Sequence, residues 1–544
     1  MTSLATPPRA QNASIGADGG VGGPPLRLWF GLILGAMTLI RLGFIGSLPL
    51  SGDEAYHWEW SRHLAPSYWD HPGMTAWLIR LGTELLPGEA GVRLPAVLCL
   101  TGTALVAFAL AQRVARQRGC TATQADRAGL IAGTLVLFVP IFAVFGVYIS
   151  TDPPLLFFAT LTWWALAIAL ETGRWSAWLG AGVALGLAAS AKFLAFTIPA
   201  AAGLTILAHR DYRCWLLRPH PYAALAATAL AFGPVLWWNA ENAWGTFDFN
   251  FSARHGEIKW SPLLALEFLG GQAVMLLPLV FGFAVLALYQ AGRRTAIGDP
   301  SNSAPGLSKL MLLASVVPLT VFGLVSFTRR IGMHWTTSCW VPALVLLAVD
   351  WAQRDPGPGA GRRRAMRWTI GTTAGVTMLM HFIAHVPPTW TDFDLAYVGW
   401  PERIRIKAFD ERYGWEQLGA AVDRTMAEMR DEDPSREVIL LGAHYGVAAI
   451  ASFYTPGRPQ AHLWSPPRDH GASYFQWDDF PALRGTNAVL VAKRQWRLDV
   501  ALKEARAHFA RVDPPEELSI RIDRLDLRPL YLIRCWDFDG DTPF

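Results

Sequence analysis

Residues 26–46 read LRLWFGLILGAMTLIRLGFIG, an apolar run with the length that a helix needs to cross a bilayer, roughly 20 residues. No small-residue cleavage site follows this run, so we expect a retained first span rather than a removable signal peptide. The residues before it, 1–25, are small, rich in Gly and Pro and weakly charged, and they are expected to form a disordered cytoplasmic tail. The chain is therefore predicted to enter a membrane near its N-terminus.

Apolar segments of similar length recur over the next 340 residues or so. The predicted spans are 26–46, 92–112, 128–149, 154–171, 176–191, 194–209, 221–238, 263–289, 309–327, 336–350 and 367–386. The composition agrees, because 52% of the residues are hydrophobic and only 17% are charged, too few charges for the surface of a soluble protein of this size. We predict a polytopic α-helical membrane protein with about eleven transmembrane helices.

Arginines gather in four of the connecting loops and predict the orientation of the spans. They are Arg113, Arg116, Arg118 and Arg127, then Arg210, Arg213 and Arg218, then Arg293 and Arg294, and last Arg362, Arg363, Arg364 and Arg367. With a cytoplasmic N-terminus all four loops lie on the cytoplasmic side, as the positive-inside bias requires. An odd number of spans then places loop 47–91 and the chain after about residue 387 outside the cytoplasm. We expect a multi-pass protein of the plasma (inner) membrane with its C-terminal part on the periplasmic side.

The chain changes character from about residue 390, where charged residues become frequent and long apolar runs stop. Glu437–Gly442 and Asn487–Ala492 are strand-like, Val447–Tyr454 is helix-like, and Ile520–Cys535 is expected to form one or two more strands. This pattern predicts a small soluble α/β domain tethered outside the membrane. The predicted parts are a tail (1–25), a transmembrane domain (26–389) and an extracytoplasmic domain (390–544).

The first external loop carries an unusual density of acids, histidines and aromatic residues. Its two informative stretches read SGDEAYHWEWSRH (residues 51–63) and SYWDHPGM (residues 67–74). A connection between two spans needs no such set, so we expect chemistry here. Two of these acids, Glu54 and Asp53, could instead have a purely structural role. Ser51 and Glu54 have the spacing of a capping box that opens an amphipathic helix on the membrane surface, and Asp53 would complement the dipole of that helix.

This loop resembles that of a known family of membrane enzymes. The sequence Asp53-Glu-Ala-Tyr56 after the first span, followed by Tyr68-Trp-Asp-His-Pro72, is similar to the bacterial 4-amino-4-deoxy-L-arabinose transferases. These are relatives of the dolichyl-phosphate-mannose protein mannosyltransferases and share the membrane glycosyltransferase fold called GT-C. The resemblance spans about residues 26–350, and its further matches are Ser150-Thr-Asp-Pro-Pro154, Ala188–Thr197, Trp238-Asn239 and Arg254-His255.

The resemblance implies a reaction and assigns roles to the acids. The family's donor is a sugar on a polyprenyl phosphate, and the acceptor hydroxyl displaces the phosphate directly with inversion. Asp53 matches the family's catalytic acid and is predicted to act as the general base, since a carboxylate can accept the proton of the attacking hydroxyl. Asp152 matches the second acidic position, although Thr151-Asp152-Pro153 is also a good helix start with Asp as N-cap. Glu54 completes the catalytic candidates.

The leaving phosphate needs cationic or hydrogen-bonding partners as its charge develops. Family members place a basic residue, commonly Lys, after the first-loop Tyr-x-acid triplet; His71 stands there in this chain, and histidine is only partly protonated near neutral pH. Tyr68 can donate without a charge. Lys192, at the external end of an apolar segment, is a permanent cation, with snorkelling to the interface as its structural alternative. Arg254 and His255 in a later external loop are the remaining candidates, with an ordinary solvated loop as the alternative.

Metal dependence is left open by the sequence. Asp53, Asp152 and His255 are the candidate ligands of a divalent ion that would bridge to the phosphate, and they come from distant loops rather than from a local motif. The chain shows no signature of nucleic-acid binding.

These observations predict a hexosyl- or pentosyltransferase that modifies an envelope acceptor, which is a glycolipid such as lipopolysaccharide, a polysaccharide, or a protein in O-glycosylation. A transporter or lipid flippase is the alternative, and such proteins place ionisable residues near the middle of the membrane. Here the acids gather in external loops while the predicted spans are almost free of charge, which favours chemistry at the membrane surface. A catalytically silent protein that keeps the fold is a third reading, left open by the departure at His71.

Overall fold

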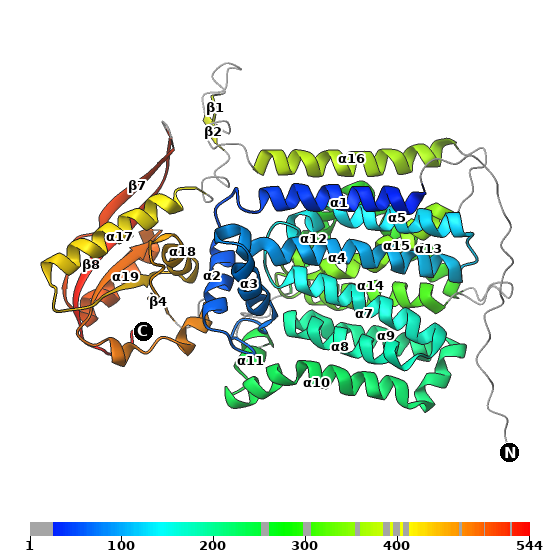
Figure 1. The fold of residues 1–544 in the computed structure, drawn as a ribbon, viewed down its shortest axis with the longest axis horizontal. Coiled ribbons are helices and arrows are strands. Elements are labelled where there is room, and N and C mark those ends of the chain that lie inside the picture. Colours follow the sequence, from blue (N-terminus) through cyan, green and yellow to red (C-terminus); the bar gives the residue numbers. More distant parts are fainter. Residues whose placement is uncertain are drawn as a thin grey trace.

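The molecule has a long helical bundle with a smaller sheet-containing domain at one end (Figure 1). The computed structural model describes residues 25–251, 260–296, 306–353, 360–384, 392–394, 403–405, 413–466, 471–493, 495–522 and 525–544.

The helices of the bundle run along the long axis of the molecule (Figure 1). They are α1 (Leu26–Phe44), α4 (Gly88–Gln117), α5 (Ala122–Phe138), α7 (Asp152–Thr172), α8 (Trp175–Ala191), α9 (Thr197–Ala208), α10 (Pro219–Glu241), α13 (Pro278–Ala296), α14 (Gly306–Val325), α15 (Trp340–Gln353) and α16 (Ala360–Ala384). Helices α4, α5, α7 and α15 form the centre, where small and aliphatic side chains from all four pack into one core. Helix α15 is buried on every side, which explains its continuous apolar sequence.

Each of the eleven predicted spans contains a helix. How many of these helices cross the membrane stays a prediction. Among the described residues, six helical segments are long and apolar enough to cross a membrane, or up to eight if each bent pair is one span. The bent pairs are α9 with the short helix η2 (Arg210–Leu217), and α12 (Pro262–Leu276) with α13.

Two of the predicted spans are not continuous helices in the structure, and a proline explains each break. The predicted span 263–289 bends by 107° between α12 and α13, where Leu277 has a φ of 70° and Pro278 follows it. The predicted span 128–149 stops at Phe138, because the residue before a proline is pushed out of the helical region and Pro140 opens the short α6 (Pro140–Phe145).

Arginines from two of the predicted cytoplasmic loops meet at one end of the bundle, as the predicted register requires. Arg118 after α4 and Arg294 at the end of α13 both bind the Asp350 carboxylate near the end of α15. Arg27 at the start of α1 binds Asp126 at the start of α5, 3.0 Å away. The helices α2 (Gly52–Arg62) and α3 (Met74–Leu85) of loop 47–91, the predicted first external loop, lie at the opposite end (Figure 1).

The C-terminal domain is built on a six-stranded mixed sheet of order β4-β3-β5-β8-β6, with β7 paired to β8. Its elements are α17 (Trp415–Glu432), β3 (Val438–Gly442), α18 (Tyr445–Tyr454), β4 (Ala461–Leu463), β5 (Asn487–Ala492), α19 (Gln495–His508), β6 (Phe509–Val512), β7 (Glu516–Ile522) and β8 (Leu525–Phe538). Strands β3 and β5 are parallel and wholly buried, which fits their uninterrupted apolar runs. The predicted strands and helix, and the α/β class, are confirmed. Two short strands, β1 (Asp392–Asp394) and β2 (Arg403–Arg405), pair with each other.

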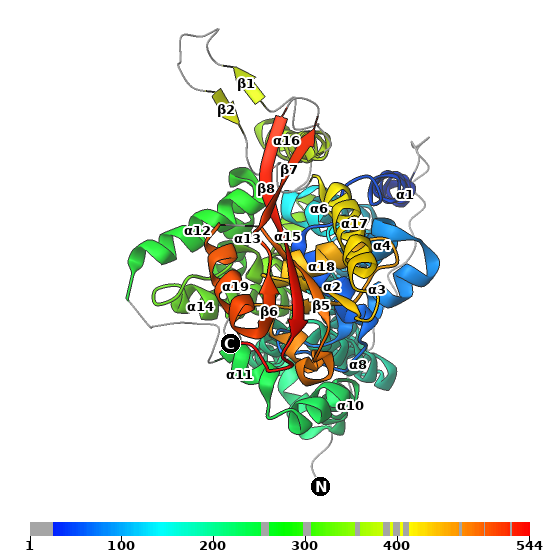
Figure 2. The ribbon, with the colours of Figure 1, turned by 90° about the vertical axis from the view of Figure 1, so that its left-hand side faces the viewer.

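This domain is docked on loop 47–91, a contact that the sequence interpretation did not foresee. Helix α18 packs on α2, and the two lie side by side in Figures 1 and 2. The Trp58 ring of α2 meets the Phe453 ring of α18 edge to face at 4.9 Å, and Arg62 Nη1 donates to Ser452 Oγ at 2.9 Å. One hydrophobic cluster joins side chains of both parts. The first loop and the C-terminal domain therefore share a core.

Candidate active site

Helix α2 begins at the capping box that the spacing of Ser51 and Glu54 predicted. Ser51 Oγ accepts the Glu54 N–H at 3.3 Å, and Glu54 Oε2 accepts the Ser51 N–H at 3.1 Å. The helix lacks the solvated polar face expected of an amphipathic surface helix, because residues 54–61 are all buried.

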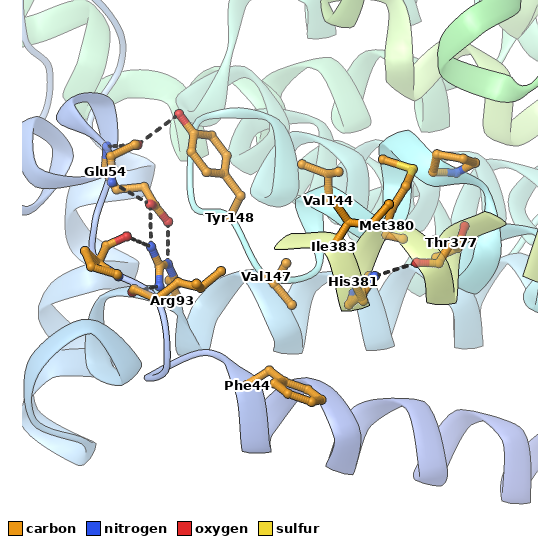
Figure 3. Close-up of a pocket in the computed structure, with 15 residues that line it drawn as sticks. Phe44, Glu54, Arg93, Val144, Val147, Tyr148, Thr377, Met380, His381 and Ile383 are labelled. Carbon is orange, nitrogen blue, oxygen red and sulfur yellow. Dashed lines mark hydrogen bonds and ion pairs between the residues drawn. The ribbon is translucent and has the colours of Figure 1, made fainter. Parts of the chain in front are cut away.

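Glu54 is fixed by further partners from two other segments. Arg93 of α4 donates from Nε to Oε1 and from Nη2 to Oε2, both at 2.7 Å (Figure 3). The Ile149 N–H donates to Oε1 at 3.3 Å, and the side chain is 1% exposed. Arg93 also binds the carbonyls of Leu48 and Pro49, at 2.6 and 2.8 Å. Both carboxylate oxygens are thus occupied, so Glu54 holds the loop together, and this removes it from the catalytic candidates.

Asp53 points away from this network and is exposed. Its Oδ1 accepts the Tyr445 hydroxyl at 2.8 Å, and its Oδ2 lies 3.5 Å from the Tyr148 hydroxyl. Burial, and secondly the charge of Asp53, raise the pKa of both tyrosines, so both hydroxyls stay protonated and act as donors. The predicted general base is therefore a solvent-accessible carboxylate held between two tyrosines, one of them from the C-terminal domain.

Asp152 and Lys192, predicted separately, form an ion pair. Lys192 ends α8, and its Nζ lies 2.8 and 3.0 Å from the two oxygens of Asp152, the first residue of α7. Asp152 is buried, and His334 Nε2 lies 3.9 Å from its Oδ2. The alternative role of Asp152 as N-cap is not observed, since Thr151 occupies that position.

One short segment connects Asp53 with Asp152. Tyr148 contacts Asp53, and the Ser150 carbonyl accepts the Thr75 hydroxyl of α3 at 3.3 Å. The Asp152 N–H then donates to Ser150 Oγ at 3.2 Å. The two acids of the resemblance thus lie at the two ends of residues 148–152, which α2 and α3 hold in place.

The prediction that Tyr68 binds the phosphate is wrong. The residue is 0% exposed, its hydroxyl donates to the carbonyls of Trp60 and His63 at 2.8 and 2.9 Å, and it accepts the Ala65 N–H at 3.1 Å. The ring stacks on Trp60. His71 is half-buried in the same turn, where its carbonyl accepts the Tyr68 N–H. Its role at the phosphate stays a prediction.

Asp70 is a buried acid that the sequence reasoning missed, although it stands inside the quoted stretch 67–74. Its Oδ2 accepts the Tyr56 hydroxyl at 2.6 Å and the Ser473 hydroxyl at 2.8 Å. Burial, and then the Asp70 charge, raise the pKa of Tyr56. This network ties α2 to the C-terminal domain, and nothing in the sequence around Ser473 signals it.

The metal prediction is not tested by the structure. Among the described residues, no group of three or more His, Cys, Asp or Glu side chains is placed to hold a metal ion. Arg254 and His255 lie outside the described residues, so the candidate ligand His255 cannot be placed relative to Asp53 and Asp152.

An apolar cavity of about 350 Å³ lies beside this loop, between α1, α6 and α16 (Figure 3). Its apolar wall includes Phe44, Val144, Val147, Met380 and Ile383. At one end it is lined by Glu54, Arg93 and Tyr148, as Figure 3 shows. Tyr148 therefore belongs both to the cavity wall and to the partners of Asp53.

The chain is similar to known proteins in sequence and in fold. Residues 70–238 match the family described as dolichyl-phosphate-mannose-protein mannosyltransferase. The lipid A galacturonosyltransferase RgtD of Rhizobium johnstonii is 27% identical over 314 residues, which are 54% of this chain. The match spans 59% of the length of that relative.

Three solved structures show the fold over almost the whole chain. The crystal structure of ArnT from Cupriavidus metallidurans in the apo state superposes with a TM-score of 0.59 at 16% identity, covering 93% of this chain and 98% of ArnT. ArnT bound to undecaprenyl phosphate also gives 0.59, at 15% identity, covering 93% and 97%. The mycobacterial arabinofuranosyltransferase AftD gives 0.51 at 15% identity, covering 95% of this chain and 40% of AftD.

The chain is a multi-pass membrane protein with the GT-C fold of membrane glycosyltransferases, so the predicted fold class is confirmed. Within that class, the resemblance to the aminoarabinose transferases and the mannosyltransferases, first recognised in loop 47–91, is also confirmed.

Proposed function

We propose that this protein transfers a sugar from a polyprenyl-phosphate carrier to an envelope acceptor, on the extracytoplasmic face of the plasma (inner) membrane. The observation that carries the proposal is Asp53, an exposed carboxylate held by two tyrosine hydroxyls at the end of a GT-C bundle. ArnT binds undecaprenyl phosphate and RgtD acts on lipid A, and these relatives favour a prenyl carrier as donor and a glycolipid as acceptor.

The proposed reaction uses the Asp53 carboxylate as its base. An acceptor hydroxyl attacks the anomeric carbon of the donor sugar and gives its proton to Asp53. The bond from that carbon to the phosphate oxygen breaks, and the phosphate leaves with the electron pair, so the configuration inverts. Oδ2 is the oxygen that receives the proton, because Oδ1 is engaged by Tyr445 at 2.8 Å whereas Tyr148 lies 3.5 Å from Oδ2.

Lys192 is the cation proposed to meet the leaving phosphate. Its pairing with Asp152 fixes the ammonium group at the external end of α8, and an ammonium has three donors, so a phosphate can bind beside the carboxylate. The 350 Å³ apolar cavity beside Tyr148 is suited to the hydrocarbon chain of a lipid substrate.

The placement of charge favours transfer over translocation. Asp53 and the Asp152–Lys192 pair lie at one end of the bundle, and Asp350 lies with its arginines at the other. Arg41, a buried charge inside the first predicted span, is in the last turn of α1 and donates to the Leu137 carbonyl at 2.6 Å. These buried charges are at helix ends, whereas a transporter typically carries such groups near the midplane.

Lys192→Ala is expected to weaken binding of a polyprenyl-phosphate sugar by about 10-fold or more, because one charge-assisted hydrogen bond to the phosphate is lost. Acceptor binding should be affected less. The measurement is donor and acceptor affinity on the same purified protein, by titration in detergent.

Because Lys192→Ala also leaves Asp152 buried without its partner, a matched variant separates binding from folding. Lys192→Met combined with Asp152→Asn removes both charges and should recover thermal stability without recovering donor affinity. If the double variant binds donor as tightly as the unaltered protein, the pair is structural and Lys192 does not contact the phosphate.

A further inference from the structure

We propose that the C-terminal domain completes the active site by placing Tyr445 as a positioning residue on the Asp53 carboxylate. This inference rests on the proposed function and extends it, because it makes a domain outside the bundle part of the catalytic arrangement. Resemblance to the transferase family was carried by residues 26–350, and it gave this domain no role.

The first observation is the direct contact between two helix starts. Tyr445 is the first residue of α18, and Asp53 is the second residue of α2. The Tyr445 hydroxyl donates to Asp53 Oδ1 at 2.8 Å, although the two residues are 392 positions apart in the chain. Tyr445 also packs its ring against Tyr56, with centroids 4.8 Å apart. The ring is therefore held on one side while its hydroxyl reaches the carboxylate.

The second observation is that glycines allow the two helices to come this close. Gly52 precedes Asp53 and Gly446 follows Tyr445, and their backbones touch. A Cβ atom on Gly446 would lie 3.1 Å from the Cα of Gly52, and one on Gly52 would lie 3.2 Å from the Cα of Gly446. A side chain at either position would push the helices apart by a few tenths of an ångström. This shift would lengthen the 2.8 Å hydrogen bond between Tyr445 and Asp53.

The third observation is that the rest of α18 is fixed to the membrane part. The Tyr454 hydroxyl at the far end of α18 donates to Glu89 of α4 at 2.9 Å and accepts the Leu50 N–H at 2.8 Å. Between the two tyrosines, Ser452 accepts from Arg62. Helix α18 is thus held at both ends, so the position of Tyr445 is set by the docking of the whole domain.

The consequence for catalysis concerns the orientation of one carboxylate. A carboxylate bound at Oδ1 cannot rotate freely, so Oδ2 keeps one direction toward the acceptor hydroxyl. Tyr445 gives no proton to the reaction and acts through Asp53.

Tyr445→Phe tests this role, because it removes the hydroxyl and keeps the ring against Tyr56. We expect kcat to fall by about 10-fold and the donor KM to stay unchanged. Gly446→Ala should lower kcat by a smaller amount, through a longer Tyr445–Asp53 contact.

Tyr222→Phe is the matched control, since it removes a hydroxyl that donates to the Leu216 carbonyl at 2.8 Å in the bundle, away from the contact between α2 and α18. It should leave kcat unchanged. A Tyr445→Phe enzyme with an unaltered or raised kcat would overturn the inference while sugar transfer itself stands. Absence of transfer by the unaltered protein would overturn the proposed function and this inference together.

Discussion

Asp53→Asn should lower the rate of sugar transfer by roughly 10²–10⁴-fold, the usual worth of a positioned general base. The amide has the size of the carboxylate, and its oxygen can still accept the Tyr445 hydroxyl, so α2 and α18 should keep their contact. It cannot accept a proton from an attacking hydroxyl. The variant should therefore fold, insert and bind a polyprenyl-phosphate sugar. The measurements are kcat, donor affinity and melting temperature on one purified preparation.

Glu84→Gln is the matched control for the loss of a carboxylate from the same external loop. Glu84 lies in α3, is exposed, and pairs on the surface with Arg80 at 2.7 Å. A surface pair of this kind contributes roughly 0–1 kcal/mol to stability, so both rate and melting temperature should change little. Similar, mild losses in the two variants would remove Asp53 from the mechanism and make Asp152 the leading base.

Glu54→Gln, one residue along, should damage folding rather than chemistry. Both partners of the Glu54–Arg93 pair are buried, and removing one partner of a buried pair typically costs about 3–5 kcal/mol of folding free energy. The amide would also lose an acceptor for the Ser51, Ile149 or Arg93 donors. We expect a large drop in melting temperature in detergent, with the remaining folded fraction still active.

A double variant provides the check on this assignment. Glu54→Gln combined with Arg93→Met removes the unpaired charge and should recover part of the lost stability. A Glu54→Gln protein that melts normally but transfers no sugar would contradict the structural role and return Glu54 to the catalytic candidates.

Much of the fold could be predicted because its signals are local. Hydrophobic length located a helix in each of the eleven segments, and arginines of two predicted cytoplasmic loops meet at one end of the bundle. The spacing Ser51-x-x-Glu54 predicted the capping box, which depends on neighbouring residues only. The break at Pro278 also had a local signal, and it was missed because apolarity alone was used to draw the span 263–289.

The site was predicted in its residue types but not in its pairings. Asp152 and Lys192 are 40 positions apart, and their ion pair exists only because the start of α7 lies beside the end of α8. Tyr68 has the chemistry of a phosphate donor, yet tertiary packing turns its hydroxyl to backbone carbonyls. Tyr445 comes from a domain whose sequence offers no catalytic motif, so its contact with Asp53 required the docked structure.

The most direct test of the central claim is an assay of the purified protein in lipid nanodiscs with lipid A and a panel of undecaprenyl-phosphate sugars. The panel would contain a hexuronic acid, an amino-pentose and a neutral hexose, with mass spectrometry of the lipids and NMR of the new linkage. The account predicts that at least one donor yields glycosylated acceptor and an equal amount of undecaprenyl phosphate, with inverted anomeric configuration. It would be contradicted by transfer with retained configuration, or by movement of the carrier between leaflets of sealed vesicles without any glycosylated product.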